Sequence, residues 1–196
     1  MQPAQFFSKL KAGAYYNWRN FKVLPSVCAA QAALESGWGE SGLTKQANNL
    51  FGMKGSYNGA SITMRTAEYT ASGQLYYINA AFRKYPNWNA SVVDYANNLR
   101  KSGYYPASAF ATQDYKTQIT LIGRVYATSP SYANDVIKMI QTYGLDKWDR
   151  DAIAGGTGGD FDASEIVSGG GSGDSSSQYK TFREDYIKEN SATRPK

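Results

Sequence analysis

The sequence predicts one α+β domain that is mainly helical and carries a small β-hairpin. The chain has 196 residues, of which 42% are hydrophobic and 14% aromatic, which is enough to bury one sizeable core. Apolar residues recur at helical spacing over most of the first 150 residues. One stretch differs, because residues 61–82 are rich in β-branched and aromatic residues on either side of a short turn.

Five helices are expected, and residues at their ends favour those ends. Proline suits the first turn of a helix, as at Pro3 and Pro25. Glycine favours the position just after a helix, as at Gly37 and Gly144. The expected helices run from Pro3 through Ala14, from Pro25 or Ser26 to Gly37, from Asn89 or Ser91 to a point before Gly103, over Tyr115–Tyr126, and over Pro130–Tyr143.

Residues 61–69 and 75–82 are expected to be the two strands of the hairpin, with Ala71, Ser72 and Gly73 in their connection. Side chains alternate between the two faces of a strand. One face is therefore expected to carry Ile62, Met64, Thr66 and Glu68 from the first strand and Tyr76, Ile78, Ala80 and Phe82 from the second.

The domain is expected to end near residue 150, where the composition changes. Residues 151–178 are rich in glycine and serine and are interpreted as a flexible linker. Residues 179–196 are highly charged and too short to fold alone, so they are either a tail or the start of a further domain. Residues 1–150 hold 16 lysines and arginines against 8 aspartates and glutamates, whereas residues 151–196 hold 5 against 8.

The basic charge of residues 1–150 indicates an anionic partner, either nucleic acid or a polymer such as a bacterial wall. Nucleic acid is disfavoured, because the basic residues are scattered rather than gathered in a stripe. No stretch approaches the roughly 18 consecutive apolar residues of a membrane-spanning helix, so no membrane partner is expected. No secretory leader is recognisable at the N-terminus.

The absence of histidine excludes several kinds of hydrolase. Serine and cysteine nucleophile systems need an imidazole base, and catalytic zinc sites are usually built on histidine. Hydrolysis by this chain would therefore depend on carboxylates, and no metal or other cofactor is expected. The single cysteine, Cys28, is expected to pack as a small buried residue.

Glu35 is the strongest candidate among the carboxylates of the domain. It lies in the last turn of the second helix, where the helix dipole and the apolar neighbours Leu34 and Trp38 would raise its pKa, as a general acid requires. Its position alone is equally compatible with an ordinary solvent-exposed glutamate at a helix end. Glu68 on the hairpin could activate water, and Glu40 is the second choice for that role. The five aspartates are interpreted as helix-end or exposed residues: Asp94, Asp114, Asp135, Asp146 and Asp149.

Four strings occur in order along the chain: AQAALESGWGES, NNLFGMKG, TAEYTASGQ followed by AAFRKY, and YATSPSYANDVIKMI. Together they resemble the family 73 glycoside hydrolases, the endo-β-N-acetylglucosaminidases of bacterial autolysins, flagellar assembly proteins and phage lysins. The resemblance covers about residues 20–143. Four ordered motifs are far more specific than any one of them alone.

The resemblance implies a lysozyme-like helical fold with the hairpin lobe beside a substrate groove, and hydrolysis of bacterial peptidoglycan after N-acetylglucosamine. It implies that Glu35 is the general acid and Glu68 the second carboxylate, which places Glu68 above Glu40. One departure is Ser129, which stands where the family commonly has an aspartate. The implied substrate-binding residues are Tyr132, Tyr126, Trp38, Asn49 and Phe51.

Three alternatives stay open at this point: a lytic transglycosylase, a muramidase, and a wall-binding module without catalysis. The missing histidine disfavours an amidase or endopeptidase. The expected place of action is the bacterial cell wall, reached by a phage-encoded or virion-associated lysin or by a secreted autolysin. Further domains are expected as partners if the chain continues beyond the linker.

Overall fold

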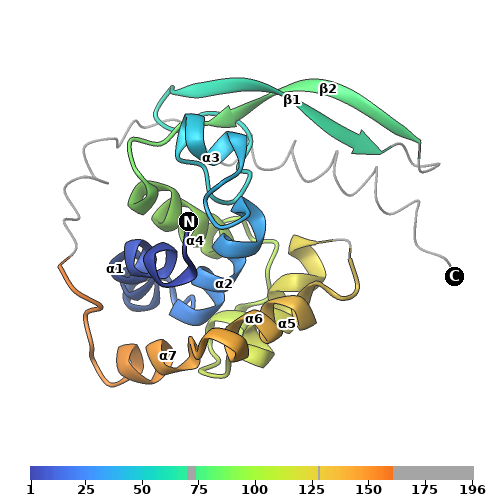
Figure 1. Ribbon diagram of the computed structural model, residues 1–196. Helices are drawn as coiled ribbons and strands as arrows, with labels where there is room; N and C mark the ends of the chain where they lie inside the picture. The colour runs from blue at the N-terminus through green and yellow to red at the C-terminus, as the bar shows by residue number, and fades with distance from the viewer. Residues whose placement is uncertain (70–73, 128, 161–196) are drawn as a thin grey trace, which may run out of the picture.

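The structure is a computed structural model, and it describes residues 1–69, 74–127 and 129–160 (Figure 1). Its elements are, in chain order, α1 (Pro3–Phe21), α2 (Pro25–Ser36), α3 (Gly42–Ala47), β1 (Ser61–Tyr69), β2 (Leu75–Arg83), α4 (Trp88–Lys101), the 3-10 helix η1 (Ala107–Phe110), α5 (Tyr115–Tyr126), α6 (Tyr132–Tyr143) and α7 (Asp146–Ile153).

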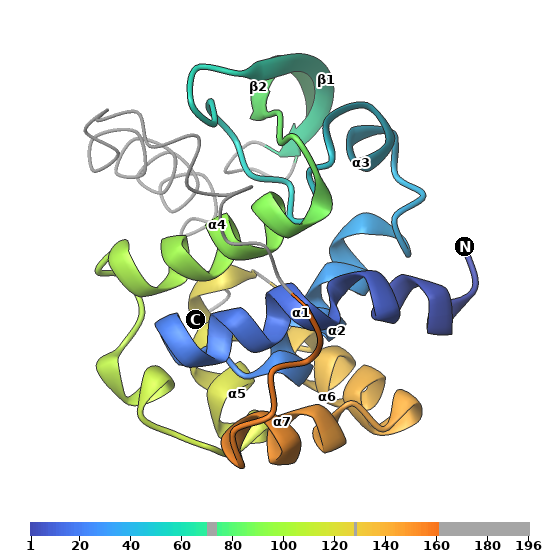
Figure 2. The same ribbon diagram turned by 90° about the vertical axis from the view of Figure 1, so that its left-hand side faces the viewer.

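Helix α2 lies at the centre of the helical domain. Every residue from Pro25 to Ala33 is buried, because this run consists almost entirely of small apolar side chains. Helices α1, α4, α5, α6 and α7 all pack against it. Figure 2 shows α1 and α2 in the middle, with α4 above them and α5, α6 and α7 below. The C-terminal end of α2 is thus supported from several sides.

The hairpin forms from the two segments that were predicted to be strands. Strands β1 and β2 are antiparallel, and the pairs include Ile62 with Phe82, Met64 with Ala80, and Glu68 with Tyr76. In Figure 1 the hairpin projects above the helices, next to α3. Most β2 side chains are exposed, and only its last two residues are buried. The hairpin therefore joins the core at its base.

All five predicted helices are present, with ends close to those expected, except that α1 continues past Ala14 to Phe21. Gly37 and Gly144 adopt left-handed conformations just after α2 and α6, as predicted. Helix α6 begins at Tyr132 rather than Pro130, because residues 130 and 131 form a turn. The short elements α3, η1 and α7 were not predicted. Cys28 is fully buried, as expected.

Helix α7 crosses the boundary predicted at residue 150 and continues to Ile153. The chain beyond it returns to α1: Arg19 donates a hydrogen bond to the carbonyl of Thr157 at 3.3 Å, and a Cβ at Gly158 would lie 2.6 Å from Cγ of Tyr15. The packed region therefore extends at least to Gly158. Residues 161–178 of the predicted linker and the charged segment 179–196 lie outside the described residues. Within the described ranges, no helix has both the length and the apolar character needed to cross a membrane.

Candidate active site

Glu35 lies in the last turn of α2, immediately before a tight left-handed turn. Gly37, Trp38 and Gly39 have φ values of 55°, 60° and 76°. A left-handed conformation is costly for a residue with a side chain, so Trp38 carries strain of about 1 kcal/mol or more. The Ser36 hydroxyl accepts a hydrogen bond from the Gly39 amide at 2.8 Å and holds the turn closed. This turn stops α2 directly after Glu35.

Trp38 is held by an aromatic cluster that offsets this strain. Its ring packs edge-on against Phe6, Phe7 and Tyr143, with centroid distances of 5.7, 5.4 and 5.1 Å. Such contacts stabilise beyond simple burial, by about 0.5–1.5 kcal/mol for a pair. Trp38 therefore anchors the end of α2 to α1 and α6. The structure places Trp38 in this aromatic cluster, rather than beside the tyrosine side chain that contacts Glu35.

A chain of hydrogen bonds leads from the buried core to Glu35. The hydroxyl of Tyr132 donates to Oε1 of Glu35 at 2.7 Å. The same hydroxyl accepts a hydrogen bond from Nε2 of Gln31 at 2.9 Å. Oε1 of Gln31 accepts in turn from the hydroxyl of Tyr95. We call this set of four side chains, from α4, α2 and α6, the relay.

The pKa of Glu35 is raised above its ordinary value. The main cause is desolvation by the surrounding protein, and the hydrogen bond from Tyr132 opposes it by favouring the charged form. The side chain is nevertheless open to solvent on one side. A carboxylic acid that keeps its proton nearer to neutral pH and still faces solvent can deliver that proton to a bound molecule.

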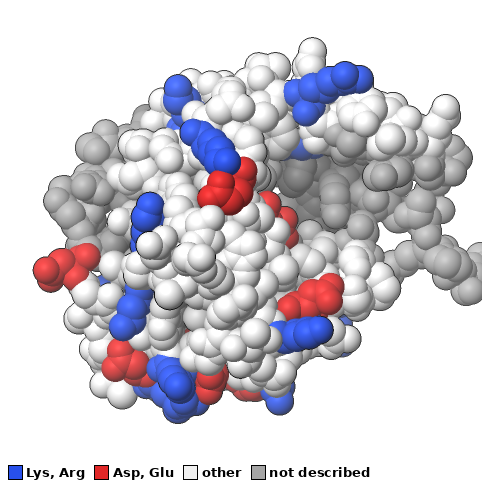
Figure 3. All heavy atoms as spheres, in the orientation of Figure 1, with Lys and Arg blue, Asp and Glu red and all other residues white. Residues whose placement is uncertain are grey.

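Four aromatic rings form a wall beside Glu35. Phe51 stacks on Tyr95 at a centroid distance of 4.0 Å and an interplanar angle of 9°. Tyr126 stacks on Tyr132 at 5.7 Å, and its hydroxyl lies 3.5 Å from the carbonyl oxygen of Phe51. The structure thus brings together Glu35, Tyr132, Tyr126 and Phe51. In Figure 3 the surface is hollowed between the hairpin and the helices below it.

Asn49 lies behind this wall, in a buried polar network. Its side chain is 1% exposed, and its amide donates to the carbonyls of Met53 and Arg83, each at 2.9 Å. Its own carbonyl oxygen accepts from the amide of Met53 at 3.0 Å. All the strong hydrogen-bonding groups of this side chain are therefore directed at the backbone. Asn49 shapes the segment that carries Phe51.

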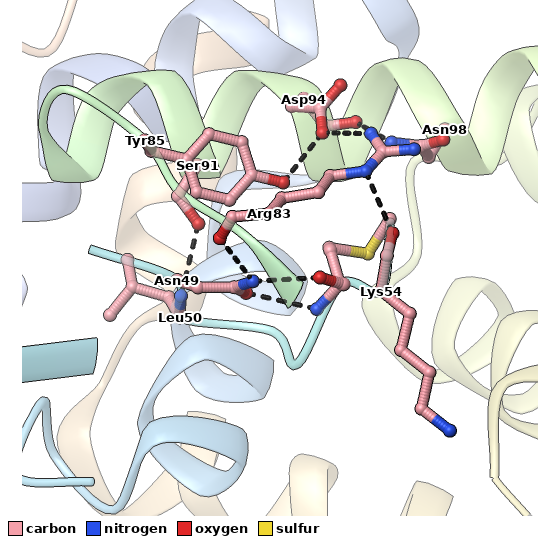
Figure 4. Close-up of polar contacts among 9 residues, drawn as sticks. Asn49, Leu50, Lys54, Arg83, Tyr85, Ser91, Asp94 and Asn98 are labelled. Carbon is pink, nitrogen blue, oxygen red and sulfur yellow. Dashed lines mark hydrogen bonds and ion pairs between the residues drawn. The ribbon is translucent and has the colours of Figure 1, made fainter. Parts of the chain in front are cut away.

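A buried ion pair ties the base of the hairpin to α4 (Figure 4). The guanidinium of Arg83, at the end of β2, pairs with the carboxylate of Asp94 on α4. Asp94 also accepts from the hydroxyl of Tyr85 at 2.7 Å, and Arg83 donates to the carbonyl of Lys54 at 3.2 Å. Asp94 is 9% exposed, so its interpretation as an ordinary helix-end residue is wrong. Its partner lies on a different element, which the local pattern could not reveal.

Glu68 lies near the far end of β1, where its backbone pairs with Tyr76. Its side chain lies outside the described part of the structure. Glu40 is exposed and forms ion pairs with Lys45 and with the amino group of Met1, both at 2.7 Å. These partners lower the pKa of Glu40 to about 2, so it stays charged and is unsuited to proton donation.

Asp149 of α7 is buried at the other end of α2. It accepts hydrogen bonds from the amide and the hydroxyl of Ser26, at 2.8 and 2.5 Å. Burial raises its pKa to about 6, although the bonds from Ser26 oppose the rise. With an exposed fraction of 4%, it is not the exposed domain-end residue that the sequence suggested.

Gln31 and Tyr95 are the residues of the site that sequence reasoning missed. One signal was present for Gln31, because it is the only strongly polar residue in the apolar run VCAAQAAL. A buried polar side chain needs a partner, so an amide in that position indicates a network. Tyr95 carried no comparable signal. Among the described residues, no group of three or more His, Cys, Asp or Glu side chains is placed to hold a metal ion.

Comparison with known proteins agrees with this fold. The family model of the glucosaminidases, described as mannosyl-glycoprotein endo-β-N-acetylglucosaminidase, matches residues 11–145. The chain is 38% identical over 152 residues to exo-glucosaminidase LytG of Bacillus subtilis, covering 74% of this chain and 53% of that protein. It is 39% identical over 145 residues to a probable N-acetylmuramidase of Lactococcus lactis, covering 69% of this chain and 32% of that protein.

Among solved structures, the catalytic domain of the autolysin Auto from Listeria monocytogenes matches with a TM-score of 0.70 and 40% identity, over 74% of this chain and 86% of that one. The chain therefore belongs to the glucosaminidase family, the family 73 glycoside hydrolases, as its four motifs predicted. The lysozyme-like, mainly helical fold is confirmed as well. The chain spans about half or less of the length of the curated relatives named above.

Proposed function

We propose that this chain hydrolyses the glycan strand of bacterial peptidoglycan at the bond after N-acetylglucosamine, with Glu35 as the general acid. The observation that carries the proposal is the state of Glu35, whose raised pKa and hydrogen bond to Tyr132 occur in a member of the glucosaminidase family. The names of relatives agree, because an exo-glucosaminidase and an autolysin are both among them.

In this mechanism, protonated Glu35 transfers its proton to the glycosidic oxygen while positive charge develops on the sugar ring. The bond between the anomeric carbon and that oxygen breaks, and the leaving sugar departs as an alcohol. A water molecule then forms the new bond to the anomeric carbon and loses its proton to a base. Removing water from around Glu35 raises its pKa, so Glu35 keeps its proton to a higher pH than an ordinary glutamate does.

Glu68 is proposed as the second carboxylate, which takes the proton of the attacking water. It lies in the TAEYTASGQ motif, and its backbone pairs with Tyr76 in the hairpin. Carboxyl groups about 6.5–9.5 Å apart favour direct inversion, while about 5–5.5 Å favours a covalent intermediate. Capture by the N-acetyl group of the substrate is a third route, in which Glu68 would orient that group.

The aromatic wall is proposed to bind the sugar rings. Tyr126 and Tyr132 present partly buried rings with polar ends, which suit stacking on the apolar face of a sugar. Phe51 and Asn49 would act by shaping the segment beside the wall. Trp38 would act through the turn that ends α2 rather than by direct stacking.

The chain is proposed to act on the bacterial cell wall, either as part of a secreted autolysin or of a phage-encoded lysin. The peptidoglycan strand would be its partner, and the excess of basic residues in residues 1–150 suits an anionic polymer. We propose residues 1–150 as the catalytic domain, together with the end of α7. Residues 151–178 would be a linker, and residues 179–196 a tail or the start of a further domain.

A muramidase is the second candidate, because one relative is named as a probable N-acetylmuramidase. Both activities need the same proton donor and differ in which glycosidic bond is positioned over it. A lytic transglycosylase would need only Glu35, since its product closes on itself without water.

The test is mass spectrometry of borohydride-reduced fragments after purified peptidoglycan is digested with this chain. Reduced N-acetylglucosamine ends are expected. Reduced muramic ends would instead make the chain a muramidase, and anhydro-muramic ends a transglycosylase. Binding to peptidoglycan without any new ends would contradict catalysis and favour a wall-binding module.

A further inference from the structure

The relay runs in one direction from the core to the acid. Gln31 is 0% exposed, and its carboxamide joins two phenols that lie on different helices, Tyr95 on α4 and Tyr132 on α6. A carboxamide has an accepting side and a donating side, so its orientation decides which phenol donates a hydrogen bond to it and which accepts one from it. The orientation of the Gln31 carboxamide therefore decides whether Glu35 receives a hydrogen bond.

The hydroxyl of Tyr95 occupies the oxygen of Gln31, which leaves Nε2 facing Tyr132. Because Nε2 can only donate, the oxygen of Tyr132 must accept from it. The hydrogen of the Tyr132 hydroxyl is therefore directed at Oε1 of Glu35. If the carboxamide were turned round, Tyr132 would donate to Gln31, and Glu35 would lose its donor.

We infer that Gln31 is a positioning residue that, through Tyr132, keeps Oε1 of Glu35 as a hydrogen-bond acceptor and leaves the acidic proton on Oε2. This inference rests on the proposed function of Glu35 as general acid. The two oxygens of a carboxylic acid are otherwise equivalent, and only one of them can face the glycosidic oxygen. Fixing the proton on Oε2 removes the unproductive arrangement in which it points back into the protein.

The packing around the relay keeps these groups in place. Phe51 stacks on the ring of Tyr95, and Tyr126 stacks on the ring of Tyr132. Each phenol is thus held by a ring contact as well as by its hydrogen bond. Gln31 and Tyr95, the buried members of the relay, are both hydrogen-bonded, and each bond in such a network polarises the next.

Four other titratable groups near the relay, three phenols and one thiol, keep their protons in the neutral range. Burial raises the pKa of the phenols of Tyr95, Tyr126 and Tyr132 well above their ordinary values, and that of the Cys28 thiol to about 12. The phenol of Tyr105 also lies close enough to influence them. A shift in the pH above which the rate falls therefore reports on Glu35 rather than on these four groups.

The test compares Gln31→Met with a matched control, Gln118→Met. Gln118 is also 0% exposed, and its side chain bonds to the backbone of Leu24, Lys22 and Ala109, away from Glu35. Both variants lose a buried carboxamide. Initial rates of release of dye-labelled fragments from purified peptidoglycan are measured from pH 5 to pH 9 at low substrate concentration.

For Gln31→Met, the expected result is a loss of roughly tenfold or more in rate, the factor that one hydrogen bond in a charged network carries. The pH above which the rate falls should also move upward, because Tyr132 becomes a weaker donor and stabilises charged Glu35 less. Gln118→Met should lower the melting temperature without moving this pH. If the pH dependence of the rate is the same in Gln31→Met as in Gln118→Met, with no upward movement, the inference is overturned.

A second variant covers the case in which Gln31→Met does not fold. Tyr95→Phe removes only the hydroxyl that orients the carboxamide, and the stack on Phe51 is kept. It should move the profile in the same direction, and an unchanged profile would equally overturn the inference. Failure of the proposed function gives a different result, namely no reduced sugar ends from the wild-type chain, or full activity in Glu35→Gln.

Discussion

The two carboxylates proposed for catalysis lie on supports of very different kinds. Glu35 ends a helix that is packed on several sides, and one of its oxygens is bonded to Tyr132 within a buried relay. Glu68 lies on a two-stranded hairpin whose second strand is mostly exposed, with Leu75 at 46% and Tyr77 at 54%. That hairpin is tied to the domain at its base, through Arg83 and Asp94.

The difference indicates a division of roles. A proton donor must have a fixed orientation and a suitable pKa, and both come from buried packing and hydrogen bonds. A group that orients water next to a large polymer must allow the polymer to enter first. A hairpin with few buried side chains has low local stability and can adjust, while its buried base keeps it attached to the helical domain.

The largest effect is expected from a change of Glu35, the carboxylate that the packed helix holds in place. Glu35→Gln should reduce hydrolysis of peptidoglycan by about 10²–10⁴-fold, because an amide cannot donate the proton to the glycosidic oxygen. The melting temperature should stay close to that of the wild type, since Glu35 is open to solvent on one side. A folded variant with near wild-type activity would rule out the assignment of Glu35.

The next effect concerns the base of the hairpin. Asp94→Asn leaves the guanidinium of Arg83 buried without its counter-charge, which should lower the free energy of unfolding by about 3–5 kcal/mol. Urea unfolding measures the loss. Asp146→Asn is the matched control, because the pair between Arg150 and Asp146 is largely exposed and should be worth less than about 1 kcal/mol. Equal losses in the two variants would contradict the role given to Asp94.

Glu68→Gln tests the carboxylate on the mostly exposed hairpin. Hydrolysis should fall by about 10²-fold, the lower end of the range for acid–base catalysis, because water loses its base. Added azide is a small nucleophile that needs no base and should restore part of the rate. Full activity without azide would show that Glu68 is not an essential base.

The smallest effect distinguishes the two influences on the pKa of Glu35, which are desolvation and the hydrogen bond from Tyr132. Tyr132→Phe removes the hydrogen bond that favours the charged carboxylate, so the pKa of Glu35 should rise further. An acid is active below its pKa, and the fall in rate at alkaline pH should therefore occur at a higher pH. Gln31 also loses its acceptor, at a cost of about 1–3 kcal/mol in the free energy of unfolding. A fall at lower pH would contradict this account.

Local patterns predicted those parts of the fold that depend on local chemistry. Gly37 and Gly144 marked helix ends because glycine readily adopts the left-handed conformation found there. The two strands were predicted from their β-branched and aromatic residues, which favour the extended backbone. Helix α3 was missed because its six residues are too few to show a period, although Ser41 caps it through the amide of Thr44 at 3.1 Å.

The parts of the site that depend on distant partners were not predictable in this way. Asp94 lies next to Arg83 only once β2 and α4 have packed, and Tyr95 reaches Gln31 across 64 positions of the chain. The raised pKa of Glu35 was expected from the helix dipole and apolar neighbours, and desolvation is its main cause in the structure. The roles of Glu35 and Glu68 stay predictions, which the variants above test.

Helix α7, the last helix of the domain, determines where this domain can be joined to another protein module. Asp149 caps the start of α2, and Gly158 rests on Tyr15 of α1, so residues on both sides of position 150 hold α2 and the neighbouring helix that packs against it. A chimeric lysin joined at residue 150 would cut α7 in two and loosen that helix at its opposite end. A fusion point after residue 160 keeps the whole support, and the next module can then be chosen for its target alone.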